Sequence, residues 1–155
     1  MVQKVLEQIA RCSEPALLKR WIENAVRQGN VTVERAARLR LYEVLPSATP
    51  GTLEYDVWQS IYALEDLESR KKGKTVRLQR TRNMIRDRKE AGTVAHLVSK
   101  RTASAGFQML LDYELPELTF EALVLKHPAQ FESGVRDAAA DRLAEANVRI
   151  EGTSP

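Results

Sequence analysis

The chain has 155 residues, of which 43% are hydrophobic and 29% are charged, and its formal net charge is +3. This length and composition allow a single domain to bury a core without disulfide or metal staples. They exclude an intrinsically disordered chain and a disulfide-rich scaffold. We therefore predict one folded domain over residues 1–150, followed by a frayed tail at 151–155.

The cysteine content and the apolar stretches bear on the compartment. The only cysteine, Cys12, cannot form an internal disulfide, which fits a reducing environment. A single cysteine also excludes a cysteine-based zinc site within one chain. No stretch approaches 18 consecutive apolar residues, and the N-terminus lacks the apolar run of a signal peptide. These features predict a cytoplasmic protein with no membrane partner.

Apolar residues recur at helical spacing through the N-terminal part of the chain. The pattern predicts a first helix near 2–11 and a second helix that is capped by Ser13. The pair Gly29-Asn30 is expected to end the second helix, because glycine and asparagine tolerate the left-handed conformation found there. Thr32 is expected to cap a third helix.

The stretch 46–51, which holds two prolines and a glycine, is the clearest break in the chain. It would separate an N-terminal helical subdomain, 1–45, from a main helical part, 52–147. Thr52 would then cap the longest helix, near 52–72. Because that helix is apolar on two sides, we expect it to be central and to pack against several others.

The remaining chain predicts shorter helices separated by caps and breakers. We expect these helices near 75–90, 93–100, 104–113, 118–127 and 133–147. Their expected first residues or caps are Thr75, Thr93, Ser104, Thr119 and Ser133. Ala91-Gly92 is expected to close the first of them, and no stretch alternates apolar and polar residues as a strand would. The prediction is an all-α, compact bundle of about eight or nine helices with no sheet.

The middle of the chain carries a concentrated positive charge. Between residues 70 and 101 twelve basic residues oppose only Asp87 and Glu90, so this segment carries +10 and the remainder must carry −7. Clustered cations can bind polyanions even when the net charge of the whole chain is small. The basic residues are Arg70, Lys71, Lys72, Lys74, Arg77, Arg80, Arg82, Arg86, Arg88, Lys89, Lys100 and Arg101.

The helix expected near 75–90 has a narrow apolar seam, formed by Leu78 and Ile85, between two basic arcs. One arc consists of Arg82, Arg86 and Lys89, and the other consists of Arg77, Arg80 and Arg88. A helix of this kind can lie across a phosphate backbone with cations that reach to both sides.

Other interpretations of the same charges stay open. The cations can form a solvated helix face, pair internally with the acidic stretches 65–68 and 112–121, or dock an acidic protein. A helix-turn-helix with its reading helix at 104–113 has little support, because only Ser104 and Gln108 there could contact base edges. No aromatic residue lies between 70 and 101, which disfavours stacking on single-stranded nucleic acid.

The sequence offers no pattern that indicates catalysis. His96 and His127 are the only histidines, and neither has a metal-ligand neighbour at the usual spacing. No Gly-rich phosphate loop, Walker-type lysine or G-x-S-x-G motif is present. The aromatic residues Tyr55, Trp58 and Tyr62 could line a ligand groove, but their helical spacing favours packing in the core. We expect no catalytic residue, no metal and no cofactor, and hence no enzyme.

The leading hypothesis is a non-enzymatic nucleic-acid-binding protein, regulatory or accessory, that contacts the phosphate backbone of DNA or RNA through the segment 70–101. The residues expected to carry this contact are Arg77, Arg80, Arg82, Arg86, Arg88, Lys89, Lys100 and Arg101. The alternative is a protein–protein interaction module, either a homo-oligomer or an adaptor for an acidic partner, with no role in nucleic-acid binding.

Overall fold

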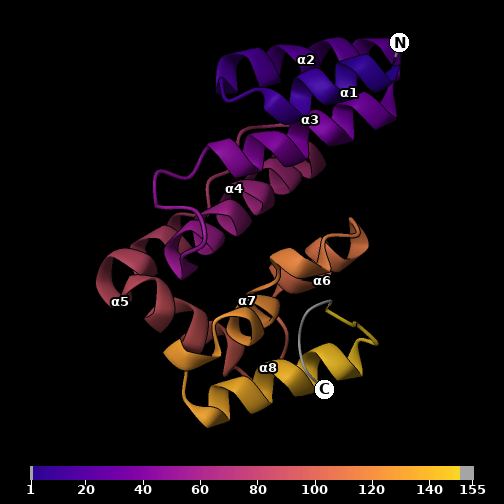
Figure 1. The fold of residues 1–155 in the computed structure, drawn as a ribbon. Coiled ribbons are helices and arrows are strands. Elements are labelled where there is room, and N and C mark those ends of the chain that lie inside the picture. The colour runs from indigo at the N-terminus through magenta and orange to yellow at the C-terminus, as the bar shows by residue number, and fades with distance from the viewer. Residues whose placement is uncertain (1, 151–155) are drawn as a thin grey trace. The chain divides into compact units, whose positions relative to one another are not determined.

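The computed structural model describes residues 2–150, and those residues form eight α-helices and two short 3-10 helices without a strand (Figure 1). The prediction of an all-α fold without a sheet is confirmed. The α-helices are α1 (Val2–Arg11), α2 (Pro15–Gln28), α3 (Val31–Val44), α4 (Leu53–Lys72), α5 (Gln79–Val98), α6 (Ala105–Asp112), α7 (Phe120–Lys126) and α8 (Ser133–Glu145). The 3-10 helices are η1 (Pro116–Leu118) and η2 (Pro128–Gln130).

The chain divides into two compact units, and the division falls between Ser47 and Ala48. This boundary lies inside the stretch 46–51 that the sequence marks as its clearest break. The N-terminal unit holds α1 to α3, and the C-terminal unit holds α4 to α8. The expected frayed tail at 151–155 lies outside the described residues.

In the N-terminal unit, α1 and α2 both pack against α3. Two of its expected caps are wrong. The residue before α2 is Glu14, not Ser13, and its side chain makes no capping bond. The cap of α3 is Asn30, whose Oδ1 accepts from the backbone N–H of Val33 at 3.1 Å. Because the left-handed Gly29 ends α2 with φ 67°, Asn30 already stands at the start of the next helix, and Thr32 lies inside its first turn.

In the C-terminal unit, α4 packs against α5, α6 and α7, as a helix with two apolar sides should. Its inner face contributes Leu53, Val57 and Ile61 to a core that also contains Val94 and Val124. Both expected ends are confirmed by the geometry. The hydroxyl of Thr52 accepts from the backbone N–H of Tyr55 at 3.2 Å, and Gly73 ends the helix with φ 68°.

The expected helices 75–90 and 93–100 are wrong in their boundaries. Residues 74–78 are not helical, and α5 runs from Gln79 to Val98 with one interruption at Lys89. Thr75 does not start a helix, because the backbone after it bonds to side chains of α4. Thr93 is not a cap either; it is fully buried, and its hydroxyl donates to the Lys89 carbonyl at 2.8 Å.

The later helices follow the expected caps closely. The hydroxyl of Ser104 accepts from the backbone N–H of Phe107, and that of Thr119 accepts from Ala122, each at 3.1 Å. Helix α8 begins at Ser133 as expected, although the residue before it, Glu132, makes no capping side-chain bond.

Buried carboxylates tie the helices of the C-terminal unit together. Asp56 of α4 bonds Nε2 of His127 at 2.7 Å and Nζ of Lys126 at 2.9 Å. Glu121 of α7 accepts from Nη1 of Arg142 of α8 at 2.7 Å. Both carboxylates are almost fully buried, so each needs the cation beside it to offset its desolvation.

Arg142 also fixes the turn that follows α5. Its Nη1 donates to the Val98 carbonyl at 3.1 Å, and its Nη2 donates to the Lys100 carbonyl. The guanidinium therefore bonds α7 and the turn with one planar group, which a lysine ammonium cannot reproduce.

We expect Arg142→Lys to lower the free energy of unfolding by about 1–2 kcal/mol, because the charge beside Glu121 is kept while bonds to the two carbonyls are lost. Urea denaturation measures the change. Arg149→Lys, which alters an exposed arginine near the end of the described chain, is the matched control. Equal stabilities for the two variants would contradict the role assigned to Arg142.

Candidate nucleic-acid interface

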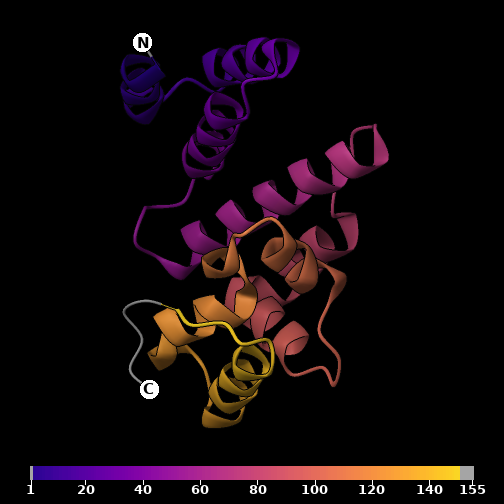
Figure 2. The same cartoon turned by 90° about the vertical axis from the view of Figure 1, so that its right-hand side faces the viewer.

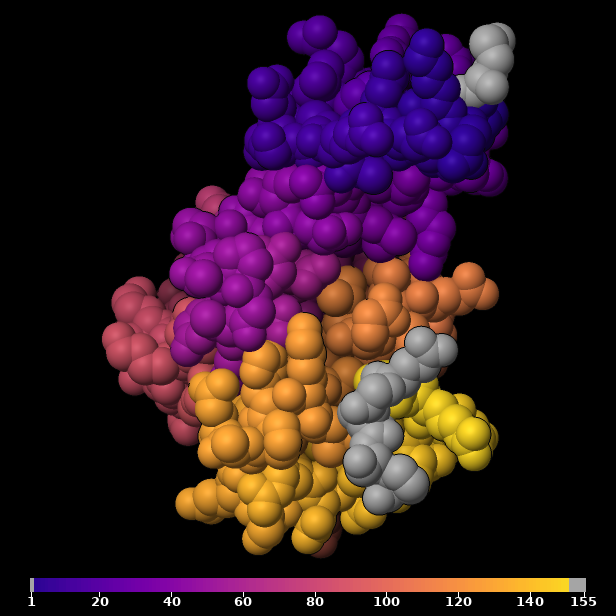
Figure 3. Space-filling view, viewed as in Figure 1, coloured from indigo at the N-terminus to yellow at the C-terminus, as the bar shows by residue number. Residues whose placement is uncertain are grey.

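The basic segment 70–101 lies entirely within the C-terminal unit. It covers the end of α4, the turn 73–78, all of α5 and the start of the turn 99–104. In Figure 2 both turns reach the right-hand side of this unit. Figure 3 shows that the side chains of α5, coloured rose at the left, reach the surface. The turns 73–78 and 99–104 are therefore separated in sequence by α5 but lie on the same side of this unit.

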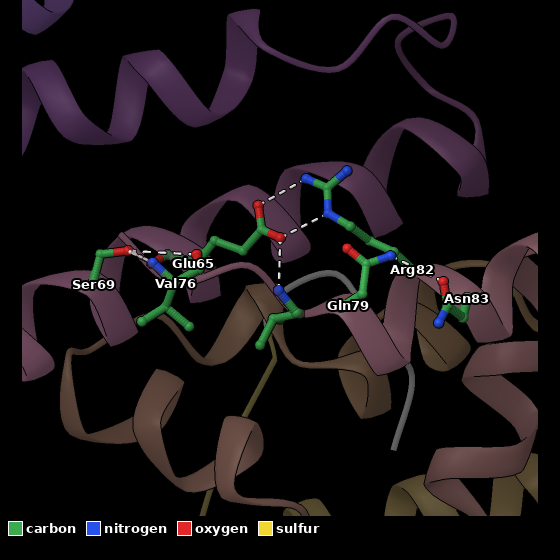
Figure 4. A network of polar contacts seen from close by, with 7 residues as sticks. Glu65, Ser69, Val76, Gln79, Arg82 and Asn83 are labelled. Atoms are coloured by element: carbon green, nitrogen blue, oxygen red, sulfur yellow. Dashed lines mark hydrogen bonds and ion pairs between the residues drawn. The ribbon is translucent and has the colours of Figure 1, made fainter. Parts of the chain in front are cut away.

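Arg82 has an internal role in place of the phosphate contact that the sequence suggests. Its Nε donates to Oε2 of Glu65 at 2.7 Å, and its Nη2 donates to Oε1 at 2.8 Å (Figure 4). The guanidinium also lies 5.1 Å from the ring centroid of Trp58 and 5.7 Å from that of Tyr62. Only 18% of the Arg82 side chain is exposed. Arg82 therefore does not contribute to the exposed positive charge of the segment.

The hydrogen bonds that Arg82 donates to Glu65 raise the pKa of Arg82 above its ordinary value, and burial opposes this shift. The cause is that the carboxylate stabilises the charged guanidinium more than desolvation penalises it. Arg82 is therefore charged, and its pair with Glu65 joins α4 to α5.

The same carboxylate positions the start of α5. Oε2 of Glu65 accepts from the backbone N–H of Leu78 at 2.9 Å. One turn further along α4, the hydroxyl of Ser69 accepts from the backbone N–H of Val76 at 2.8 Å (Figure 4). These bonds hold the turn 73–78 against α4, and with it Lys74 and Arg77. The acidic stretch 65–68 was an expected internal partner for the cations, but nothing in the sequence singles out Glu65.

Lys89 interrupts α5 with φ 63° and ψ 178°. This combination lies in a region that is essentially restricted to glycine. Two side chains bond next to the break: Nε1 of Trp58 donates to Oε2 of Glu90 at 3.0 Å, and Thr93 donates to the Lys89 carbonyl. Gly92, expected to end the helix, is instead helical, and a Cβ there would lie 3.1 Å from Cβ of Arg88. The two arcs expected for a straight helix over 75–90 therefore hold only between Gln79 and Arg88.

We expect Lys89→Gly to raise the free energy of unfolding by about 1 kcal/mol. Relief of the strained backbone is worth about 1–3 kcal/mol, and the greater freedom of glycine in the unfolded chain offsets about 0.5–1 kcal/mol of it. Lys89→Ala removes the same charge but keeps the Cβ, so it is the control for urea denaturation. A glycine variant less stable than the alanine variant would show that Lys89 is not strained.

The other seven predicted residues are all exposed, and we call them the exposed cations. They are Arg77, Arg80, Arg86, Arg88, Lys89, Lys100 and Arg101. Arg86 contacts its neighbour Asp87 at 3.4 Å, in a pair whose side chains are 71% and 68% exposed. Within residues 2–150 the remaining six form no ion pair. An exposed pair contributes little, so all seven charges are available to a partner.

Two cations at the end of α4 contact groups of the same unit. Arg70 lies over the ring of Tyr113, 5.5 Å from its centroid, and Nζ of Lys72 lies 3.7 Å from Oε2 of Glu68. Both contacts are partly or fully exposed. These basic residues suit the negative end of the helix dipole, so they have a structural explanation that the exposed cations lack.

An apolar pocket of about 190 Å³ lies between α4, both ends of α5, α6 and α7. Its apolar lining includes Leu64, Leu78, Leu97, Phe107, Leu110 and Phe120. Leu78 directly follows Arg77, and Ser104, which also lines the pocket, follows Lys100 and Arg101 by a few residues. Three exposed cations therefore stand on backbone that leads into the lining of the pocket. Sequence reasoning missed this pocket because its walls come from five separate segments.

No metal-binding cluster is seen in the part of the chain that the structure describes. His127 bonds to Asp56, and no three His, Cys, Asp or Glu side chains gather there in a way that could hold a metal ion. In the same residues no helix has the length and apolar character needed to cross a membrane.

Comparison with known proteins yields no relative: no family model matches the chain, and neither a curated protein nor a solved structure matches it. The function therefore has to be inferred from the side chains and their placement.

Proposed function

We propose that the chain is a non-enzymatic nucleic-acid-binding protein, regulatory or accessory, whose C-terminal unit contacts phosphate groups through the exposed cations. Each cation that reaches a phosphate displaces condensed counterions from the nucleic acid, and this release supplies the affinity. Arginine donates to phosphate oxygens in a bidentate manner, which suits a surface with five arginines among its seven cations.

One observation carries the proposal. The buried carboxylates Asp56, Glu65 and Glu121 each bond a cation of their own unit. Six exposed cations form no such pair in residues 2–150, although residues 48–155 contain equal numbers of basic and acidic residues, sixteen of each. The charges are therefore segregated, and a unit with no net charge still presents a local cationic surface.

The experiment is a salt titration of binding. Fluorescence anisotropy with labelled single-stranded and duplex oligonucleotides, of DNA and of RNA, should show affinity that falls steeply and linearly on a log–log scale as salt rises. With about five to seven phosphate contacts, the slope should be about −4 to −6. Absence of binding to every oligonucleotide at 50 mM salt would refute the proposal.

Exposed acidic residues on the same unit favour a second candidate function, self-association through unlike charges. Asp137, Asp141 and Glu145 of α8 are all exposed, and they could attract the exposed cations of another copy. Sedimentation velocity at low and high salt decides between the candidates. A species that remains a monomer at low salt would refute self-association and leave nucleic-acid binding untouched.

A further inference from the structure

The pocket of about 190 Å³ has an apolar interior and one lining carboxylate without a close cationic partner. Of its polar groups, Ser104 and Thr119 cap helices, and Glu121 bonds Arg142. Glu68 remains: its only ion pair in the described residues is the distant contact to Lys72, and its side chain is 19% exposed. Thr81 also lines the pocket. A ligand that entered would therefore meet apolar walls and one hydrogen-bond acceptor with a negative charge.

The surroundings of the pocket have the opposite charge. Arg77 precedes Leu78 and Arg80 precedes Thr81, and both of those following residues line the pocket. Lys100 and Arg101 stand in the turn that leads to Ser104. All four cations are exposed. Arg142 fixes this turn through the Lys100 carbonyl, so the cations beside the pocket stand on backbone that is held in place.

This combination discriminates among ligands. A fatty acid or the apolar anchor of an acidic peptide would suit the walls and the cations, but it would bring a negative charge towards Glu68. A nucleobase has apolar faces, and its exocyclic amino group donates to a carboxylate, as cytosine N4 does to Glu or Asp. Its negative charge sits on the flanking phosphates, where the exposed cations are.

We propose that the pocket takes one unpaired, amino-bearing base of a single-stranded nucleic acid. In this arrangement the base faces contact the leucine and phenylalanine walls, the amino group donates to Glu68, and Arg77, Arg80, Lys100 and Arg101 bind the phosphates on either side. Unpaired bases are commonly recognised by insertion between apolar and aromatic side chains, with hydrogen bonds to the base edge. The inference rests on the proposed function and narrows it to single strands.

The first experiment compares a (dC)12 strand, a (dT)12 strand and a 12-base-pair duplex by fluorescence anisotropy at fixed salt. Cytosine carries an exocyclic amino group and thymine does not, while the two strands carry the same backbone charge. We expect (dC)12 to bind about fivefold or more tightly than (dT)12. We also expect (dC)12 to bind about tenfold more tightly than the duplex. Both preferences should depend on the pocket.

Two variants with matched controls test the site itself. Ala105 is exposed, begins α6 and lines the pocket, so Ala105→Trp should fill the pocket and abolish the preference of (dC)12 over duplex. Ala103→Trp, at an exposed position outside the lining, should not. Glu68→Leu should abolish the ratio between (dC)12 and (dT)12. Its control, Glu54→Leu on the same helix, removes the same charge and should leave that ratio unchanged.

The outcomes separate this inference from the proposed function. Equal binding of (dC)12 and (dT)12, or an Ala105→Trp variant that behaves like Ala103→Trp, would overturn the pocket assignment and leave phosphate binding by the cations in place. Tighter binding of duplex than of either strand would also overturn it. No binding to any of the three would refute both proposals.

Discussion

Replacement of Arg80, Arg88 and Lys100 by alanine together is expected to weaken nucleic-acid binding about 100-fold at 100 mM salt. These residues are exposed, and none forms an ion pair within the described chain. Each lost phosphate contact should also reduce the magnitude of the salt slope by about one. The affinity and slope are measured by the same anisotropy titration, so the affinity loss can be assigned to lost phosphate contacts.

A matched triple variant controls for the change in total charge. Lys4, Lys19 and Arg20 are exposed residues of the N-terminal unit, and their replacement by alanine removes the same three charges elsewhere. We expect this control to keep at least about a third of the wild-type affinity, because a charge outside the contact surface acts only through a screened field. An equal loss of affinity in both triple variants would show that the segment 70–101 is not the contact surface.

The second large effect concerns stability. Arg82→Leu is expected to lower the free energy of unfolding by about 3 kcal/mol, because it leaves the Glu65 carboxylate without its cation in a largely buried place. This figure is the lower end of the usual range for a broken buried pair, since 12% of the Glu65 side chain is exposed. Loss of the contacts with Trp58 and Tyr62 adds to the effect. Urea denaturation followed by circular dichroism measures it.

Two further variants make this prediction specific. Arg86→Leu, one turn later in α5, breaks a pair with more than two thirds of each side chain exposed, so it should change stability by less than about 0.5 kcal/mol. The double variant Glu65→Leu/Arg82→Met should recover most of the lost stability, because removal of both charges leaves no unpaired carboxylate. A double variant as unstable as Arg82→Leu alone would contradict the assigned cause.

Helix positions could largely be predicted from local signals, and the exceptions have physical reasons. Thr52, Ser104 and Thr119 cap helices as expected because the bond joins a hydroxyl to an amide three residues later. Thr75 and Thr93 carry the same signal and fail. The chain near Thr75 is held by Ser69 and Glu65 of another helix, and the hydroxyl of Thr93 bonds backward to Lys89. A tertiary contact decided the first position, and a local bond within α5 decided the second.

The candidate interface could be predicted only in part for a related reason. Charge counting identifies a basic segment, but it cannot separate a cation that faces solvent from one that bonds a buried carboxylate. Arg82 and Arg86 are one helical turn apart in the same expected arc, yet Arg82 is 18% exposed and Arg86 is 71% exposed. The break in α5 at Lys89 also interrupts the expected arcs of basic side chains. No residue type near Lys89 predicts this backbone geometry.

The absence of aromatic residues between 70 and 101 argued against contact with unpaired bases. A binding surface, however, need not be continuous in sequence. Phe107 and Phe120 lie outside the segment, and the fold places both in the pocket that Leu78 and Leu97 also line. An aromatic surface beside the cations thus arises from tertiary packing of α6 and α7, which composition within a segment cannot show.

The two tryptophans lie in different units, so the fluorescence of each can report on its own unit. Trp21 packs against the core of the N-terminal unit, whereas Trp58 lies under the Arg82 guanidinium and bonds Glu90 beside the break in α5. With Trp21 replaced by phenylalanine, tryptophan emission comes from Trp58 alone. Its fluorescence then follows the unfolding of the C-terminal unit, and any ligand that shifts α5 should change it without an attached dye.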